Sequence, residues 1–356
     1  DYAQTELSGS ATSANANGTE KVTITVQEKD QYGNSLGSNT GTLTLSASPS
    51  NGVTIENIQS NGDGTYTADV SSSVASNVVI SGSIDGNAIS DTTSIDFVQA
   101  LDVSQTVYTL SSTSVSANGT DEVTATVTLK DFEGQAFEPA SGTVSFATDG
   151  SVTSSAVTAQ GGGVYVVTLT STSAGSVTIT PRLDSTDLSS AQTVTFTAAL
   201  DVSQTTLALS TNTVDADGTS TVTATVTLKD YAGQAFVPAS GTVSFTTTGT
   251  ANGSGATHQG GGIYTEAFTS TTAGTVTITP KLDSTDLAAA QSVTFTSVGP
   301  DLAQSTITVN SSATKVNNPL QLTVTLKKAD GSDYGQSGGT LALSSSPTGI
   351  TDSVVD

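Results

Sequence analysis

The sequence predicts an all-β protein, built as a rod-like array of tandem β-sandwich domains. Three observations support this fold class: the chain repeats itself with a long period, apolar residues alternate with threonine in short segments, and Gly and Ser are frequent between those segments. Aromatic residues make up only 5% of the chain, and it has no Trp, Met or Cys. Such a composition suits many short strands better than helices, because Val and Thr fit a pleated sheet while Gly and Ser mark turns.

The repeat is clearest in the middle of the chain. The segment LDVSQT begins at Leu101 and again at Leu200, and VTATVTLKD follows it at the same spacing in both copies. A looser copy precedes these two, and a fourth copy begins at Asp301 and is incomplete at Asp356. Solenoid repeats are only ~20 to 50 residues long, so this longer period indicates whole domains. The expected domains are residues 1–100, 101–199 and 200–299, with a partial domain at 300–356.

Each copy contains a clear strand pattern. Val123, Ala125, Val127 and Leu129 alternate with threonines, which is the period-two pattern of a half-buried strand. The pattern stops at a Lys-Asp turn, and about six or seven short strands are expected in each unit, separated by turns rich in Gly or Asp. In the second copy the other strands are expected around residues 107–110, 144–146, 165–169, 177–179 and 194–196.

The first copy carries three segments with a family resemblance: NGT at Asn17, KD at Lys29 and NGDGTYTA from Asn61 to Ala68. Together with the alternating strand, this layout resembles the bacterial Ig-like repeat modules of invasin and intimin-type adhesins, over the whole chain with the fourth module incomplete. The resemblance implies tandem Ig-like β-sandwich domains in the stalk of a large adhesin, which is extracellular and lies on the bacterial cell surface. Because the matching motifs are structural, the resemblance identifies no receptor-binding residue.

The charge balance excludes two classes of partner. The chain has 32 acidic and 9 basic residues, for a net charge of −23. Nucleic acids and anionic membranes bind clustered Lys and Arg, so neither is expected as a partner. No apolar run approaches the ~20 residues that a membrane helix needs, so direct membrane insertion is not expected either.

The sequence does not predict an enzyme. The single histidine, His258, aligns with Ala159 of the second copy, so the repeats cannot share a function that depends on it, and a solvated loop position is expected. The triple glycines at residues 161–163 and 260–262 lack the strand-loop-helix context and the Lys of a phosphate-binding loop. Hairpin turns with positive φ angles explain them, because Gly adopts such angles without steric cost.

Aspartates that recur at fixed positions are the candidate metal ligands, and calcium is the candidate cofactor. A solvated turn is the competing and favoured interpretation, because Asp is a common turn residue and the spacing matches no EF-hand loop. The aspartates at the domain junctions open a recurring D-x-[AS]-Q-[ST] signature and are equally suited to capping backbone amides. The junction candidates are Asp102, Asp201 and Asp301, and the second group is Asp184, Asp187, Asp283 and Asp286.

Four asparagines fit the N-x-[ST] acceptor pattern for glycosylation. The match arises easily in a chain rich in Ser and Thr, and Asn-Gly is itself a turn signal, so turns are the favoured interpretation. These residues are Asn17, Asn118, Asn252 and Asn310.

The organisation of the domains favours the function of a long spacer. Only Ala198, Ala199 and Leu200 separate the strand around Phe196 from Asp201, so the joint lacks a flexible spacer. Sandwiches with ~10-residue strands would give a length of about 120 Å for three and a half units. The chain is then a structural stalk that projects a distal binding region from the cell. Its partners are other domains of the same polypeptide, with host or surface ligands and neighbouring copies as further candidates.

Two other functions stay open. In the first, the chain is a self-assembling filament, sheath or surface-layer subunit, in which a strand from a neighbouring chain completes the fourth unit. In the second, the chain binds carbohydrate through exposed aromatic residues. The sequence has no Trp, and Tyr165 fits the core pattern, so surface residues such as Tyr231 and Tyr334 would have to hold the sugar.

Overall fold

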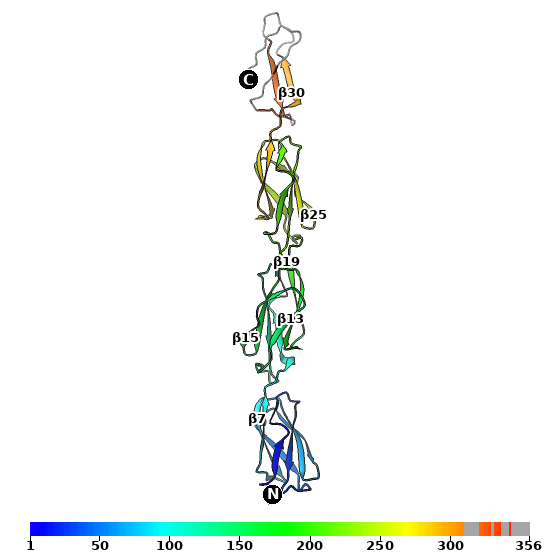
Figure 1. Ribbon diagram of the computed structural model, residues 1–356, viewed down its shortest axis with the longest axis vertical. Coiled ribbons are helices and arrows are strands. Elements are labelled where there is room, and N and C mark those ends of the chain that lie inside the picture. Colours follow the sequence, from blue (N-terminus) through cyan, green and yellow to red (C-terminus); the bar gives the residue numbers. More distant parts are fainter. Residues whose placement is uncertain (310–319, 329–330, 336–341, 343–356) are drawn as a thin grey trace. The chain divides into compact units, whose positions relative to one another are not determined.

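The computed structural model describes residues 1–309, 320–328, 331–335 and 342. Contacts between residues divide the chain into two compact units, Asp1–Ala198 and Ala199–Asp356. Strands dominate both units (Figure 1). The only helical element among the described residues is a short 3-10 helix, η1, at Val103–Gln105.

The first unit contains two sandwiches, and each sandwich has two sheets. In the first sandwich the strand orders are β1-β3-β6-β5 and β2-β9-β7-β4, with β8 paired to β7. The strands are β1 (Glu6–Gly9), β2 (Ser13–Asn15), β3 (Val22–Gln27), β4 (Leu43–Ser48), β5 (Val53–Ser60), β6 (Thr65–Ser72), β7 (Ser76–Ile84), β8 (Asn87–Ala88) and β9 (Thr93–Val98).

The second sandwich follows η1 and repeats this plan. Its strand orders are β10-β12-β16-β14, with β15 also paired to β16, and β11-β19-β17-β13, with β18 paired to β17. The strands are β10 (Val107–Leu110), β11 (Ser114–Ala117), β12 (Val123–Thr128), β13 (Val144–Thr148), β14 (Thr153–Ser154), β15 (Thr158–Gly161), β16 (Val164–Thr170), β17 (Gly175–Leu183), β18 (Thr186–Asp187) and β19 (Gln192–Ala198).

The second unit holds a third sandwich with the same strand orders, β20-β22-β26-β24 and β21-β29-β27-β23, and with β25 and β28 as the added short strands. Two further strands, β30 and β31, pair with each other. The strands are β20 (Thr206–Leu209), β21 (Thr213–Asp215), β22 (Val222–Thr227), β23 (Val243–Thr248), β24 (Asn252–Gly253), β25 (Thr257–Gly260), β26 (Ile263–Thr269), β27 (Gly274–Leu282), β28 (Thr285–Asp286), β29 (Gln291–Thr296), β30 (Asp301–Val309) and β31 (Leu322–Lys327).

The opening segment of each sandwich crosses from one sheet to the other. In the second sandwich β10 pairs antiparallel with β12, whereas β11 pairs parallel with β19. The other two sandwiches have the same crossing. The sequence predicted a strand at 107–110 and missed β11, which is short and made of small residues. One segment thus supplies an edge strand of both sheets, and β10 and β11 are only four residues long, a length that limits pairing of these edges with other chains.

Side chains alternate between core and surface as the sequence predicted. In β12, Val123, Ala125 and Val127 are completely buried, and the threonines between them are half-buried. Ile179 and Phe196 of the facing sheet belong to the same core. Burying side chains of this size stabilises a fold by about 1.5–3 kcal/mol each, so the two sheets are held together mainly by these apolar layers.

These observations confirm the predicted fold class, an all-β chain of tandem Ig-like sandwiches. The turns expected after the alternating strand are present at residues 131–134 and 230–233. The rod-like arrangement of the domains stays a prediction, as does the expected division at 1–100, 101–199, 200–299 and 300–356.

Candidate functional site: the aspartate turns

Asp102 opens the second sandwich as the cap of η1. Its Oδ1 accepts hydrogen bonds from the backbone N–H of Ser104 at 2.9 Å and from the Ser104 hydroxyl at 2.6 Å. Its Oδ2 accepts one from Nε2 of Gln105 at 3.0 Å. The backbone N–H of Asp102 in turn donates to the carbonyl of Lys130 at 2.8 Å. The D-x-S-Q signature is therefore a capped turn that is fastened to the Lys-Asp turn after β12.

Gln105 links the two turns a second time. Its Nε2 also donates to the backbone carbonyls of Asp131 at 3.1 Å and Phe132 at 3.2 Å. Asp131 is buried, and its Oδ1 accepts the backbone N–H groups of Glu133 at 3.0 Å and Gln135 at 2.7 Å. The spacing of Asp, Ser and Gln thus lets one short segment satisfy several backbone groups that a tight turn leaves without partners.

The third sandwich repeats the same hydrogen bonds. Asp201 accepts from the N–H of Ser203 at 2.9 Å, from the Ser203 hydroxyl at 2.6 Å and from Nε2 of Gln204 at 2.9 Å. Gln204 again reaches the carbonyl after the alternating strand, that of Asp230 at 3.3 Å. Asp301 accepts from the N–H of Ala303 at 2.7 Å. Each of the three junction aspartates therefore accepts a hydrogen bond from the backbone N–H two residues further on, at Asp301 within the start of β30.

These hydrogen bonds favour the ionised carboxylates. The Ser104 and Gln105 side chains lower the pKa of Asp102, and the Ser203 and Gln204 side chains lower the pKa of Asp201. In both cases donors to the charged form outweigh the opposing effect of desolvation. Both side chains are therefore anionic acceptors at neutral pH.

Two aspartates of the second group, Asp184 and Asp283, lie in the turn between β17 and β18 and in the equivalent turn between β27 and β28. Asp184 has a φ angle of 54°, and its Oδ1 accepts the N–H of Thr143 at 2.9 Å. Asp283 has a φ angle of 53° and accepts the N–H of Thr242 at 2.9 Å. Asp is one of the few residues that tolerate this left-handed conformation, because its short side chain bonds locally. These aspartates thus tie the turn to the strand beside it.

The last two candidates form surface ion pairs. Asp187 accepts from Nε of Arg182 at 2.6 Å, and Asp286 pairs with Nζ of Lys281. Their carboxylates are more than half exposed, so each pair contributes little to stability. Each pair joins the two strands of its short hairpin at the end away from the turn.

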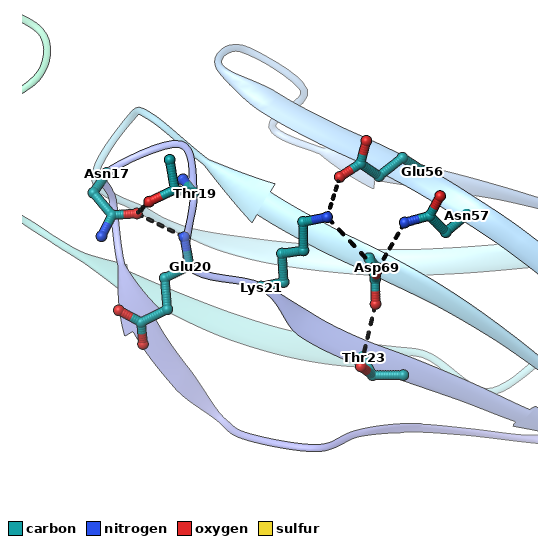
Figure 2. Close-up of polar contacts among 8 residues, drawn as sticks. All are labelled: Asn17, Thr19, Glu20, Lys21, Thr23, Glu56, Asn57 and Asp69. Carbon is teal, nitrogen blue, oxygen red and sulfur yellow. Dashed lines mark hydrogen bonds and ion pairs between the residues drawn. The ribbon is translucent and has the colours of Figure 1, made fainter.

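A third turn, with Asn or Asp at its start, precedes each long alternating strand. The sequence marked Asn17 and Asn118 as turn residues and as glycosylation candidates, and it did not indicate the equivalent Asp217. Oδ1 of Asn17 accepts from the N–H and the hydroxyl of Thr19 at 2.9 and 3.0 Å and from the N–H of Glu20 at 2.7 Å (Figure 2). Asn118 makes the same three contacts in the second sandwich. In the third sandwich Asp217 stands at the same position, and its shortest hydrogen bond is from the N–H of Ser220 at 2.6 Å.

The family of the chain follows from a comparison with protein-family models. The model described as Invasin, domain 3 matches residues 1–100, 102–199 and 201–298 in succession. The chain belongs to the invasin domain 3 family. Each match covers one of the three complete sandwiches, so the repeated turns described above belong to invasin-type domains.

Solved structures of several adhesins are similar to the chain. The FdeC adhesin of Escherichia coli is 22% identical over 84% of this chain and 98% of that chain, with a TM-score of 0.45. Invasin, a bacterial integrin-binding protein, is 24% identical over 90% of this chain and 67% of that chain, also with a TM-score of 0.45. InvD of Yersinia pseudotuberculosis is 19% identical over 82% and 97% of the two chains, with a TM-score of 0.40. The family assignment rests on the family model, because these TM-scores lie below 0.5.

No curated protein sequence matches the chain.

In the invasin-type domains the calcium candidates do not converge. Among the residues that the structure describes, no three His, Cys, Asp or Glu side chains are grouped as a metal site would need. Calcium takes six to eight oxygen ligands, whereas each of these turns supplies carboxylate oxygens that already accept N–H or O–H donors. The calcium assignment to these aspartates stays a prediction.

His258 lies on strand β25, not in the loop that the sequence predicted. It is exposed and stacks on Tyr264 of β26, with ring centroids 4.5 Å apart and an interplanar angle of 18°. Both triple glycines confirm the predicted positive-φ turns. Gly260, Gly261 and Gly262, which follow His258, have φ angles of 94°, 56° and 75°, and Gly161, Gly162 and Gly163 have φ angles of 80°, 61° and 75°. At Gly163 a Cβ atom would lie 2.6 Å from the carbonyl oxygen of Leu129, so close backbone contact also requires glycine.

The glycosylation candidates occupy different settings. Asn17 and Asn118 use their side-chain oxygens in the turns described above, and Asn252 lies exposed on β24. Asn310 lies outside the described residues. Glycosylation at these positions stays a prediction.

One charged cluster is particular to the first domain. Nζ of Lys21 lies 2.7 Å from Oε1 of Glu56 and 3.8 Å from Oδ2 of Asp69 (Figure 2). Asp69 also accepts from Nδ2 of Asn57 at 2.9 Å, and Asn57 has a φ angle of 54° at an irregularity in β5. The cluster connects the residue just before β3 with β5 and β6 at the surface, and no sequence motif predicted it.

None of the helical segments in the described part of the chain is long and apolar enough to cross a membrane.

Proposed function

We propose that the chain is a stalk segment of an extracellular bacterial surface adhesin, with no catalytic role. The observation that carries this proposal is the match of three successive segments, residues 1–100, 102–199 and 201–298, to the invasin domain 3 family. An array of similar domains adds length with each copy, because every domain has its own core. The stalk would hold a distal binding region away from the cell.

The recurring polar residues support a structural role. The side chains of Asp102, Gln105 and Asp131 bond within or beside their own turns. A binding site for a ligand would instead keep several polar groups free to converge on it. The D-x-[AS]-Q-[ST] signature is therefore explained by turn formation, and the same explanation holds for its copy at Asp201.

The proposed partners follow from the family and the charge. Invasin is an integrin-binding protein, and we extend from it only the class of partner, a host or surface ligand that other domains of the same polypeptide would bind. A net charge of −23 disfavours contact with nucleic acid and with anionic membranes. We therefore place the chain outside the bacterial cell surface, between its anchor and its ligand.

Small-angle scattering with analytical ultracentrifugation on residues 1–356 tests the proposal. A stalk predicts a monomer at every concentration, with a maximum dimension of about 120 Å from the rise of stacked strands. Concentration-dependent polymers would instead support the self-assembling filament, sheath or surface-layer subunit, and a compact particle would contradict both. Glycan binding that disappears in Tyr231→Ala, without loss of folding, would favour the carbohydrate-binding function.

The same measurement with millimolar calcium tests the proposed metal sites. Calcium at the junctions would displace the N–H donors of Asp102 and Asp201, because both carboxylates are occupied by their turns. A calcium-dependent stiffening that is lost in the double variant Asp102→Asn and Asp201→Asn would establish these ligands. An unchanged scattering curve, with wild-type stability in calcium, would remove calcium from the proposal.

A further inference from the structure

We propose that Asn51 and Asn61 of the first domain are sites of spontaneous deamidation, and that the fold protects the other asparagines that precede glycine. In this reaction the backbone nitrogen of the following residue attacks the side-chain Cγ and ammonia leaves. Water then opens the resulting cyclic succinimide to aspartate or isoaspartate. Glycine favours the attack because it has no side chain to block it and gives the backbone freedom to reach the required geometry.

The sequence contains five Asn-Gly pairs, so sequence alone would rank all of them as reactive. They differ in what the structure does with the glycine nitrogen, which must lose its proton before it attacks. The pairs are Asn17-Gly18, Asn51-Gly52, Asn61-Gly62, Asn118-Gly119 and Asn252-Gly253.

Two pairs are protected by the turns before β3 and β12. The N–H of Gly18 donates to the carbonyl of Ser72 at 2.9 Å, and the N–H of Gly119 donates to that of Ser171 at 2.9 Å. The side chain of Asn17 is also held, because its Oδ1 accepts three hydrogen bonds (Figure 2). Attack would require this turn to open. The rate of deamidation is therefore proportional to the small fraction of molecules in which the turn is open.

Asn252 is protected in another way. It lies with Gly253 on β24, where Asn252 pairs with Thr269 and Gly253 with Phe268. The paired strand holds the backbone extended and resists the rotation that would bring the glycine nitrogen to Cγ.

The two remaining pairs lack this protection. Asn51, Gly52, Asn61 and Gly62 are all exposed, and they lie in the connections before and after β5. Within the described structure, neither the Gly52 nor the Gly62 nitrogen donates a hydrogen bond. The side chain of Asn61 makes a single contact, from Nδ2 to Oγ1 of Thr65 at 2.9 Å. Around Gly62 the space is open, with no atom within 4 Å of an added Cβ, whereas a Cβ at Gly52 would lie 2.3 Å from Cγ2 of Val74. The case for Asn51 therefore rests on its exposure and on the Gly52 nitrogen, which donates no hydrogen bond within the described structure.

Deamidation would change the turn between β5 and β6. The new carboxylate at position 61 would lose the Nδ2 donor to Thr65 and would lie two residues from Asp63, whose Oδ1 accepts from the N–H of Thr65 at 3.0 Å. The isoaspartate product would also lengthen the backbone by one carbon. Each event would add one negative charge to a chain that already carries −23.

Peptide mapping by mass spectrometry of the folded chain, aged at neutral pH, tests the proposal. We expect conversion at Asn51 and Asn61 to be at least ~10-fold faster than at Asn17, Asn118 and Asn252, which react only after local opening. The same chain aged in denaturant is the control, and there all five sites should react at comparable rates. A variant with Asn51→Gln and Asn61→Gln should lose the early acidic species in isoelectric focusing.

Two results would overturn the proposal. One is equal conversion of Asn118 and Asn61 in the folded chain, which would show that the Gly119 hydrogen bond gives no protection. The other is an intact Asn61 in the folded chain under conditions where the denatured chain reacts at that site.

Discussion

Single side-chain oxygens build the turn that precedes β3, β12 and β22. Asn17, Asn118 and Asp217 stand at the same position and accept the same backbone N–H groups. Since only an oxygen acceptor is used, an amide and a carboxylate can both serve. The carboxylate of Asp217 gains more from the contact, because hydrogen bonds from Ser220 and Thr219 lower its pKa well below the ordinary value.

Substitution at this position separates the acceptor from the charge. Asp217→Ala removes the acceptor for the N–H groups of Thr219 and Ser220 and should lower the stability of the third domain by about 1 kcal/mol. Asp217→Asn keeps the oxygen and should cost less. Chemical denaturation of the full chain measures both variants, and equal losses for Ala and Asn would contradict an acceptor role.

Glu266 is a buried position at which the second and third domains differ in polarity. It is 8% exposed on β26, at the position that Val167 occupies on β16, where it is 3% exposed. Both face an alanine of the neighbouring strand, Ala224 and Ala125. The buried apolar residues of the second domain form one cluster, whereas those of the third form two. The buried carboxylate accepts one backbone hydrogen bond, from the N–H of Gly255 at 3.0 Å, which offsets little of the free-energy cost of burying a charge.

Exchanging these two residues should move stability in opposite directions. Glu266→Val should stabilise the third domain by about 1–3 kcal/mol, and Val167→Glu should destabilise the second by a similar or larger amount. Calorimetry of the full chain, with hydrogen exchange to assign each transition to its domain, measures both. A loss of stability in Glu266→Val would show that the carboxylate has a role that its single hydrogen bond does not reveal.

At the level of elements, the triple-glycine hairpins test two effects of glycine separately. Gly161 has a φ angle of 80° and open space around it, so Gly161→Ala should cost about 1 kcal/mol from backbone strain alone. Gly163→Ala adds a clash with the Leu129 carbonyl and should cost about 3 kcal/mol. Thermal unfolding of both variants gives the comparison, and equal losses would mean that the backbone shifts to relieve the clash.

The sequence predicted those strands and turns that are marked by the pattern of residues within a single short segment. Val123 to Leu129 alternate because one face of β12 is buried, and the turn glycines are visible because no other residue adopts their angles freely. β11 was missed because its pairing with β19 depends on residues far along the chain. The hydrogen bonds of Gln105 were missed for the same reason, since they depend on how two turns meet in space.

At the level of the whole molecule, acid stability should follow the aspartate turns. Hydrogen-bond donors lower the pKa of seven aspartates in the described structure, namely Asp30, Asp63, Asp69, Asp102, Asp149, Asp201 and Asp217. A carboxyl whose pKa is lower in the folded state contributes stability above its unfolded pKa of about 3.9, and this contribution is lost as pH falls through the folded value. Melting temperatures should therefore be nearly constant near neutrality and fall below about pH 4.

The variant Asp217→Asn isolates one part of this acid response. Its third domain should lose less stability between neutral pH and pH of about 3 than the unsubstituted domain, because one linked proton is removed. An identical acid response in the two proteins would place the pH dependence elsewhere.

The linker between the first and second domains has a side-chain contact that the linker before the third domain lacks the residue to make. Nε2 of Gln99 donates to Oδ2 of Asp131 at 2.8 Å and to the carbonyl of Ala136 at 2.9 Å. Asp131 is the same carboxylate that organises the Lys-Asp turn of the second domain. The equivalent linker position before the third domain is Ala198, which has no side-chain donor. Stiffness in a stalk would then be set joint by joint through individual side chains.

Gln99→Ala should therefore loosen the first joint and leave each domain intact. Domains joined by short linkers move relative to each other unless specific contacts restrain them. In Gln99→Ala we therefore expect a broader distribution of maximum dimensions in small-angle scattering. Amide relaxation should show faster independent tumbling of the first domain. Gln160→Ala, at an exposed position on β15, is the matched control that changes a glutamine away from the joint. Unchanged relaxation in Gln99→Ala would show that the backbone of the linker, and not this side chain, sets the stiffness of the joint.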